Sequence, residues 1–525
     1  MDNGQDQDPA TPHSANARAD MYLVDVLEHR LVKAQPSCRY IALSYVWGGV
    51  EMFQTMRSNL ADLEQPGGLI QHLPKIPPMI RDAIQFVAQV GERFLWTDVL
   101  CIIQDDTRIK HEQINQMGLV YGRSFATLIA PAAKDANFGL PGVRPNTRLP
   151  FQVTEQIGEH RLGTEPPDSL YSIRNGKYHA RGWTLQEQLL SPRCLYFTEH
   201  QIYLHDNGAL HSEFGGELTG VEQDDIRHLN YFWDTSWVRR YEAFEDLAPW
   251  EVAFRIYARL IGDFTSRQLS YGTDALKAVA GLLSTLQSRL GGTFLCGLPE
   301  AHIDHALLWG PAPHTSPTRN FSFPSWSWAG WVGQSEYTRK PVYLGLSHAP
   351  VRLTAELEDL STFVQAPIRG VGGPKDTPWI VDPQLFRDIH VLSFRASVVN
   401  ARFFFFGSPA PTISMLQPEP TSAILASRGS VPARCGVLFH KPDTLMFELS
   451  RAHEYAFVLL SRRESGGVSP EFHYDEEHFP TRPWSILNVM LISGIPREAQ
   501  RMAIGQMHED AFELACPKKE DILLY

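Results

Sequence analysis

The sequence predicts an α/β protein: a mainly parallel sheet in an N-terminal domain, then a mainly helical middle region and a β-rich C-terminal region. The 525 residues exceed the roughly 250–300 residues that one hydrophobic core supports. Between residues 22 and 205, short apolar runs alternate with helical patterns, which is typical of parallel crossover units. The predicted divisions are a disordered polar leader (1–21), the α/β domain (22–205), the helical region (206–320) and the β-rich region (321–525).

Four nearly continuous apolar runs predict the buried strands of the N-terminal sheet. They span residues 39–46, 94–96, 125–130 and 194–197, and the last forms a hairpin with 202–204. Three helices are expected between them: one follows the proline pair at 77–78, a second contains Ile114, Met117 and Tyr121, and a third covers 181–190. In the first, the i, i+3, i+4, i+7 positions are apolar: Ile80, Ala83, Ile84 and Val87.

The other two regions show different periodicities. Phe254, Tyr257, Ala258 and Ile261 have helical spacing in the middle region. Beyond residue 321, β-like runs at 402–406, 455–460 and 487–492 predict strands. The segment PSWSWAG (324–330) alternates large and small residues, so we expect Trp326 and Trp328 to be structural residues of a half-buried strand.

Composition and missing motifs exclude several classes of function. The net charge of −12 offers no basic field for a nucleic acid, and no apolar stretch approaches the roughly 18 residues of a membrane span. The six cysteines are scattered singly, as in a reduced, cytoplasmic protein. Phosphate-loop, nucleophile-elbow, zinc-protease and dinucleotide motifs are absent from the sequence. A group of possible metal ligands, His205, Asp206, His211 and Glu213, matches no familiar metal-site spacing, and its neighbours predict a solvated loop. We therefore expect no metal and no bound cofactor.

Two polar groups follow predicted strands, where open α/β sheets bind ligands. Ser44, Tyr45 and Trp47 end the first strand, although a tryptophan packed over the Gly48-Gly49 turn is the simpler interpretation. Asp98 ends the next strand. Asp105 or Asp106, before the following helix, is more typical of a helix N-cap than of a catalytic acid.

A third group lies in RGWTLQE, residues 181–187. Trp183 and Glu187 are four residues apart and share one face of a helix, with Gln186 beside them. A carboxylate next to an indole could hold a planar, electron-poor ring and contact its sugar. The alternative is a core tryptophan with Glu187 paired to Arg181 or Arg193.

Together these groups resemble the three ordered blocks of the HET domain of heterokaryon incompatibility proteins. The blocks read YIALSYVWG (40–48), WTDVLCIIQDD (96–106) and RGWTLQE (181–187), so the resemblance covers residues 22–205. PSWSWA at 324–329 is also similar to a segment common in these proteins. Ile103 stands where the family usually has Asn, and His205 stands where a Cys is common.

The resemblance implies a fungal cytosolic protein of non-self recognition and regulated cell death. HET domains are distantly similar to TIR domains, which implies a TIR-like (flavodoxin-like) fold, and some TIR domains hydrolyse NAD through a Glu four residues after a Trp. Trp183 and Glu187 reproduce that spacing. NAD is then the substrate and no cofactor is needed. The competing hypothesis is a non-catalytic, self-associating signalling domain with a protein partner.

On the catalytic hypothesis, each residue has an implied role. Glu187 is catalytic and contacts the ribose hydroxyls and the developing positive charge. The substrate-binding residues are those that stack on nicotinamide (Trp183 or Trp47), line the pocket (Ser44, Tyr45 and Asp98), lie beside the helix face (Gln186) or meet the pyrophosphate (Arg181).

Overall fold

The computed structural model describes most of the chain. The described residues are 21–35, 38–164, 169–174, 176–206, 209–213, 216–217, 248–312, 315–337, 353–355, 357–363, 385–387, 391–407, 423–427, 433–439, 454–463, 474–475, 477–480, 482–494 and 498–525. Apart from Met21, the predicted leader (1–21) lies outside them.

The N-terminal sheet is mixed, with a parallel centre. Its described strands follow the order β11-β10-β9-β8-β5-β3-β4-β1-β2. The four central strands are parallel and confirm the four predicted ones: β3 (Ile41–Ser44), β4 (Phe94–Trp96), β5 (Ala126–Ile129) and β8 (Arg193–Phe197). Antiparallel strands flank them: β1 (Tyr22–Asp25), β2 (Arg30–Lys33), β9 (Ile202–Asp206), β10 (Ala209–Ser212) and β11 (Gly216–Glu217).

The order of the parallel strands locates the ligand-binding edge. Numbered along the chain, these four strands lie in the order 2-1-3-4, which is how a flavodoxin-type sheet begins. The order reverses between β3 and β5, where Ser44 pairs with Ile129 at the carboxyl ends of both strands. Ligands of doubly wound sheets bind outside such a switch point.

The helices around this sheet follow the predicted pattern with one correction. Helix α2 (Pro78–Gln89) starts with a proline at its first turn and buries Ile80, Ala83 and Val87. The predicted helix through Ile114 and Tyr121 is wrong, because the chain leaves helical geometry at Gln116 and forms α4 (Thr107–Asn115) and α5 (Met117–Arg123). In α5, Gly118 packs so closely that an added Cβ would lie 3.0 Å from the Gly281 Cα.

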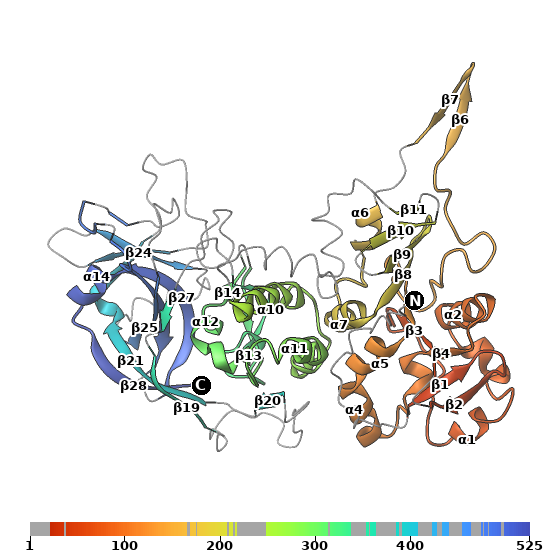
Figure 1. Ribbon diagram of the computed structural model, residues 1–525, viewed down its shortest axis with the longest axis horizontal. Helices are drawn as coiled ribbons and strands as arrows, with labels where there is room; N and C mark the ends of the chain where they lie inside the picture. The colour runs from red at the N-terminus through yellow and green to blue at the C-terminus, as the bar shows by residue number, and fades with distance from the viewer. Residues whose placement is uncertain are drawn as a thin grey trace, which may run out of the picture.

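The remaining N-terminal elements are short. They are α1 (Leu60–Leu63), η1 (Ile70–Lys75), α3 (Asp98–Cys101), the hairpin β6 (Thr154–Ile157) and β7 (His160–Gly163), α6 (Ser169–Arg174) and α7 (Gly182–Leu190). The β6–β7 hairpin projects away from the rest of the domain (Figure 1).

From residue 248 to residue 312, the described part of the middle region is mainly helical, as predicted. Helix α10 (Pro249–Thr265) buries Phe254, Tyr257 and Ile261. The elements that follow are η2 (Gly272–Asp274), η3 (Lys277–Val279), α11 (Ala280–Leu286), β12 (Phe294–Leu295), β13 (Leu298–Pro299), η4 (Glu300–His302), α12 (Ile303–Ala306), β14 (Gly310–Pro311) and β15 (Thr318–Arg319).

The tryptophan segment is buried but is not a strand. Trp326 and Trp328 are fully buried, and Trp328 begins the 3-10 helix η5 (Trp328–Gly330). Ser327 turns the chain, because its Oγ accepts from Ala329 N at 3.0 Å and donates to the Cys296 carbonyl at 2.7 Å. This tertiary contact overrides the two-residue periodicity.

The C-terminal region is β-rich, as predicted. Most of its described strands form one antiparallel sheet in the order β19-β21-β25-β26-β27-β24-β23-β22, with β18 on β25 and β28 on β21. The short strands β16, β17 and β20 pair instead with strands of the middle region. The predicted runs at 455–460 and 487–492 lie in β25 (Tyr455–Arg463) and β26 (Ile486–Ser493). The run at 402–406 is a strand only from Phe404, because Ala401–Phe403 form η6.

The bounds of the remaining described elements complete the region. They are β16 (Trp331–Val332), β17 (Ser335–Glu336), β18 (Leu353–Ala355), β19 (Glu358–Phe363), β20 (Phe386–Arg387), β21 (Val391–Asn400), β22 (Phe404–Gly407), β23 (Ala423–Ser427), β24 (Arg434–Phe439), β27 (Gln500–His508), α14 (Glu509–Leu514) and β28 (Lys518–Leu524).

Helix α7 lies between the N-terminal sheet and the helical region (Figure 1). Its Leu185 and Leu189 belong to an apolar cluster that includes α10 and α11 and extends to β21 and β26. A separate cluster fills the N-terminal sheet and its helices. The predicted boundaries of the regions stay predictions.

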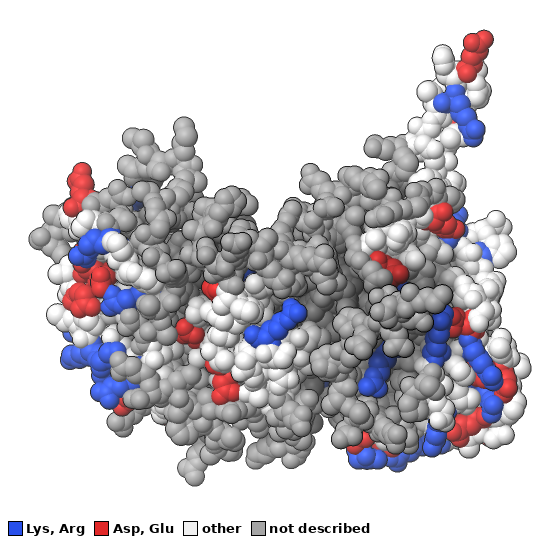
Figure 2. Space-filling view, viewed as in Figure 1, with Lys and Arg blue, Asp and Glu red and all other residues white. Residues whose placement is uncertain are grey.

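The described surface carries both signs of charge. Figure 2 shows basic and acidic side chains interspersed over the N-terminal domain on the face displayed. Among the described helices, none has both the length and the apolar character needed to cross a bilayer.

Candidate active site

The segment after β3 brings polar groups to the switch point. Ser44 is the last residue of the strand and is buried, as is Tyr45. The following turn requires glycine at position 48, where φ is +69° and a Cβ would lie 2.1 Å from the Asp135 Cβ. The chain thus turns sharply just beyond Trp47, which leaves the carboxyl end of β3 accessible to side chains from other elements.

Glu187 reaches this end of β3 from α7. Its side chain is buried, and its Oε2 accepts a hydrogen bond from Ser44 Oγ. The Tyr178 hydroxyl lies 2.8 Å from the same Oγ. Because the single hydroxyl proton of Ser44 points to the carboxylate, Tyr178 is the donor in this second bond. The three groups form a chain of hydrogen bonds that ends on the Glu187 carboxylate.

Burial changes the protonation of Glu187. Loss of solvent raises its pKa to about 7, and the negative charge of Asp98 acts in the same direction. The Arg181 charge and the hydrogen bonds of Ser44 and Tyr121 oppose that rise. The carboxyl group therefore exchanges its proton near neutral pH, which is the range a catalytic acid or base requires.

Asp98 is the second carboxylate of the site. Trp47 Nε1 donates to its Oδ2 at 2.8 Å, and Val99 N donates to its Oδ1 at 2.8 Å. Burial nevertheless raises the pKa of Asp98. The hydroxyl of Tyr45 is buried without a hydrogen-bond partner among the described residues, and Arg181 Nη1 donates to the Tyr45 carbonyl at 2.5 Å.

The structure thus gathers six of the eight predicted residues at one edge of the sheet: Ser44, Tyr45, Trp47, Asp98, Arg181 and Glu187. The other two lie differently on α7. Trp183 is partly buried and packs against both apolar clusters. Gln186 faces the helical region, where its Oε1 accepts from Gly281 N at 2.7 Å. Their contacts to substrate stay predictions.

The alternatives raised by the sequence have separate outcomes. Within the described residues, Glu187 forms no ion pair with either arginine: Arg181 donates to a carbonyl, and Arg193 pairs with Asp206 at 3.3 Å. Asp106 is the N-cap of α4, as predicted, because its Oδ1 accepts from Ile109 N at 3.0 Å. Trp47 is partly buried and packs against the apolar cluster of the N-terminal domain, and its ring nitrogen also binds Asp98.

Sequence reasoning missed three residues that support the site. Tyr178 orients Ser44, and Tyr121 donates to the Leu43 carbonyl at 3.2 Å and contributes to the environment of Glu187. Thr184 Oγ1 bonds to the carbonyls of Tyr178 and Arg181 at 2.6 and 2.8 Å. Tyr178 lies just before the third block and Thr184 lies within it. This proximity to the block was the one signal in the sequence that could have indicated a role in the site.

The interpretation of the four residues considered for a metal site as a solvated loop is wrong, because His205 and Asp206 lie in β9 and His211 lies in β10. Glu213 pairs with Arg148 at 2.8 Å, Asp206 pairs with Arg193, and His205 is buried. Among the described residues, no group of three or more metal-ligating side chains is found.

A parallel-centred sheet with the buried carboxylate of Glu187 at its switch point and the partly buried Asp98 nearby has the architecture in which α/β domains bind ligands at the carboxyl edge. Residues 40–187 match the family model described as heterokaryon incompatibility protein (HET). Residues 40–187 are therefore assigned to the HET domain, as the three sequence blocks predicted. No curated protein and no solved structure matches the chain.

Proposed function

We propose that the HET domain hydrolyses NAD at the bond between nicotinamide and ribose, and that this reaction serves non-self recognition and regulated cell death in the fungal cytosol. The observation that carries the proposal is Glu187: a buried carboxyl group with a pKa of about 7 at the switch point. Its position four residues after Trp183 on α7, together with the 2-1-3-4 strand order, supports a TIR-like arrangement.

The chemistry fits a site with one catalytic carboxylate. Nicotinamide is a cationic leaving group that departs with the bonding electrons as a neutral molecule, so it needs no general acid. The C1′ of ribose becomes an oxocarbenium-like cation, and ionised Glu187 stabilises that charge. Water then adds to C1′ and loses its proton to the carboxylate or to solvent. The products are nicotinamide, ADP-ribose and one proton.

Neighbouring groups have supporting roles in this mechanism. Ser44 holds the carboxylate through its hydrogen bond, with Tyr178 fixing the hydroxyl direction. Trp47 is partly exposed and is held by Asp98, so its ring can stack on nicotinamide. Arg181, also partly exposed, keeps guanidinium donors for the pyrophosphate.

Nicotinamide release tests the proposal directly. The purified full chain is incubated with NAD at low and at high protein concentration, since a site that closes on assembly would be silent when dilute. Release should be abolished in Glu187→Gln and retained in Glu159→Gln, an exposed glutamate in the turn of the β6–β7 hairpin. Equal release by both variants would refute the role of Glu187.

One observation favours the second candidate, a self-associating signalling domain. In the β6–β7 hairpin, the register places Val153, Ile157 and Leu162 on one face, and they are 60%, 59% and 55% exposed. Glu155 and His160 share this face, and several exposed apolar side chains on a projecting arm are typical of an interaction surface. If Ile157→Lys abolishes assembly in solution and nicotinamide is never released, this function replaces the catalytic one.

A further inference from the structure

The start of α7 is held from outside the N-terminal domain, by the turn that follows α10. Gln268 in this turn donates its backbone N–H to the Ala180 carbonyl at 2.6 Å, and its own carbonyl accepts from Gly182 N at 2.7 Å. The two bonds flank Arg181, which forms an isolated parallel bridge with Gln268. Gln268 thus satisfies the first backbone N–H of α7, which has no acceptor within the helix.

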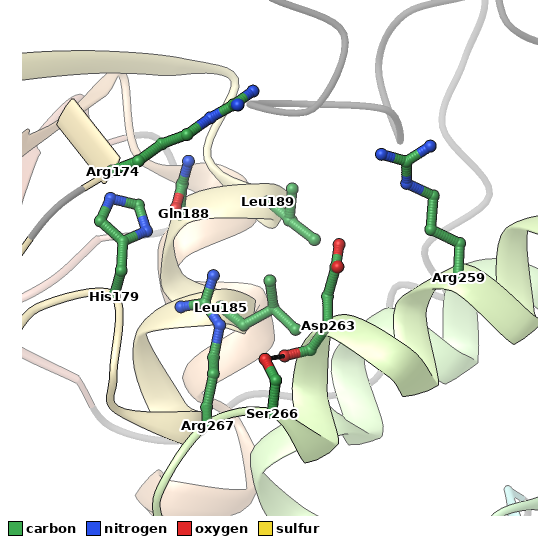
Figure 3. A pocket seen from close by; sticks show the side chains of 9 residues that line it. All are labelled: Arg174, His179, Leu185, Gln188, Leu189, Arg259, Asp263, Ser266 and Arg267. Atoms are coloured by element: carbon green, nitrogen blue, oxygen red, sulfur yellow. Dashed lines mark hydrogen bonds between the residues drawn. The ribbon is translucent and has the colours of Figure 1, made fainter. Parts of the chain in front are cut away.

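Neighbouring side chains strengthen the same contact. Arg267 Nη1 donates to Thr184 Oγ1 at 3.2 Å, and that Oγ1 lies 2.8 Å from the Arg181 carbonyl. Figure 3 shows Arg267 directed from the end of α10 toward α7. Gly182 lies so close to the turn that an added Cβ would be 2.6 Å from Leu269 Cδ2. The first turn of α7 is therefore fitted to this part of the middle region.

A second contact with the middle region lies one turn further along α7. Gln186 Oε1 accepts from Gly281 N at 2.7 Å, at the start of α11. The approach is close, because a Cβ on Gly281 would lie 2.8 Å from Gln186 Oε1 and 3.0 Å from the Gly118 Cα. Gln186 is buried and directly precedes Glu187. The part of the helix from which Glu187 reaches the sheet is therefore tied to α11.

The apolar contact between α7 and α10 is incomplete. A cavity of about 320 Å³ lies beside both helices, and Leu185, Gln188 and Leu189 of α7 line it (Figure 3). Side chains that border a cavity lack part of the van der Waals contacts that hold a helix in a filled interface. The hydrogen bonds of Gln268 and Gly281 therefore supply a larger share of the restraint on α7.

We propose that the middle region positions the candidate active site through Gln268 and Gly281. The first holds the segment that carries Arg181, and the second holds the turn of α7 that carries Glu187. Both lie outside the matched residues 40–187. A displacement of α10 and α11 relative to the sheet would therefore move both side chains, which gives the middle region control of the site. The effect on turnover rests on the proposed NAD hydrolysis, whereas the effect on the Glu187 carboxyl group does not.

Amidation of carboxyl groups by a carbodiimide and an amine measures the exposure of Glu187 without NAD. The full chain is treated, and mass spectrometry compares three side chains. Glu187 is 6% exposed and should react slowly, whereas the exposed Glu159 should react readily. Asp82 is buried in α2 and pairs with Arg144 at 2.8 Å, so it should stay unmodified and reports any general unfolding.

Gly281→Ala tests the contact with α11. The new Cβ would crowd Gln186 Oε1, so the Gly281 N–H loses its acceptor. Amidation of Glu187 should rise several-fold relative to the exposed reference, while the buried reference stays unmodified. The control is Gly262→Ala on α10, where the Cβ would lie 3.7 Å from its nearest neighbour, and amidation should be unchanged.

Gln268→Pro and Gln268→Ala form a matched pair for the other contact. Gln268 has an exposed side chain and holds α7 through its backbone, so alanine should behave like the wild type. Proline removes the N–H that binds the Ala180 carbonyl, and amidation of Glu187 should rise. Where NAD is hydrolysed, Gln268→Pro should mainly raise KM, because Arg181 contacts the substrate. Gly281→Ala should mainly lower kcat, because Glu187 acts in the chemical step.

Each contact is judged by its own pair of variants. If a variant and its control give equal amidation of Glu187, that contact has no positioning role. Amidation of Asp82 together with Glu187 in both Gly281→Ala and Gln268→Pro would also overturn the proposal, because the change would then not be local to α7. Local amidation of Glu187 in a protein that never releases nicotinamide would support the positioning role and count against NAD hydrolysis.

Discussion

Replacing Glu187 by glutamine tests the buried carboxyl group through stability as well as activity. Burial raises its pKa from the usual 4.5 to about 7. The folded protein thus binds this proton more tightly than the unfolded chain does, so the free energy of unfolding falls as the pH rises from about 4.5 to about 7. At about 1.4 kcal/mol per unit of pKa, the loss is on the order of 3 kcal/mol.

Glutamine keeps the shape of the side chain and can accept the Ser44 hydrogen bond, but it has no charge to bury. We therefore expect variant and wild type to be similarly stable near pH 4.5, and the variant to be more stable above about pH 7 by on the order of 3 kcal/mol. Urea unfolding at both pH values measures the difference. Glu159→Gln, which makes the same chemical change at an exposed position, should show no such dependence.

The Glu187→Gln variant should lose activity although it gains stability above about pH 7. Nicotinamide release by the same Glu187→Gln preparation should fall roughly a hundredfold or more, as for loss of a well-placed electrostatic contact. A residue whose removal stabilises the fold and abolishes turnover is kept for function. A variant that is destabilised equally at both pH values and keeps full turnover would refute this reasoning, because Glu187 would then be a structural hydrogen-bond acceptor.

The remaining predictions concern the neighbours of this carboxyl group and one core tryptophan. If ionised Glu187 is required, the wild-type rate should rise with pH to a midpoint near 7; Ser44→Ala removes a donor to the carboxylate and should raise that midpoint. Asp98→Asn removes a nearby negative charge and should lower it, and a shift in the same direction for both variants would contradict the electrostatic account. Trp328→Ala empties a fully buried site and should cost about 3–5 kcal/mol, so an unchanged urea midpoint would show that the ring does not support the core.

The central strands could be predicted because they are buried on both faces. The residues of β3 and β5 are all buried, so each strand appears in the sequence as a continuous apolar run bounded by turns. The flanking β2 buries only one of its four residues and gives no comparable signal, whereas β1 is as short and as buried as β3 and was not predicted. The exposed hairpin β6–β7 has no buried face at all, and nothing in its sequence indicates an arm.

The candidate site was predictable where its residues belong to local patterns. Ser44 and Asp98 follow strands, and Glu187 has helical spacing from Trp183, so their positions followed from secondary structure. Tyr178 is different, because its hydroxyl meets Ser44 across 134 positions of sequence. Such a contact depends on how α7 packs, and no periodicity encodes it. The same limit explains Trp328, where a bond from Ser327 to Cys296 decides the local turn.

The packing of α7 explains why an apolar helix carries so many polar residues. Leu185 and Leu189 pack against the helical region, while Glu187 turns to the sheet and meets Ser44. Gln186, the residue before Glu187, accepts a hydrogen bond from the Gly281 amide. A helix buried on all sides can keep polar groups only where each has a partner, and here the partners come from two different parts of the chain. The family match ends at residue 187, but the position of the Glu187 carboxylate also depends on contacts near residue 281.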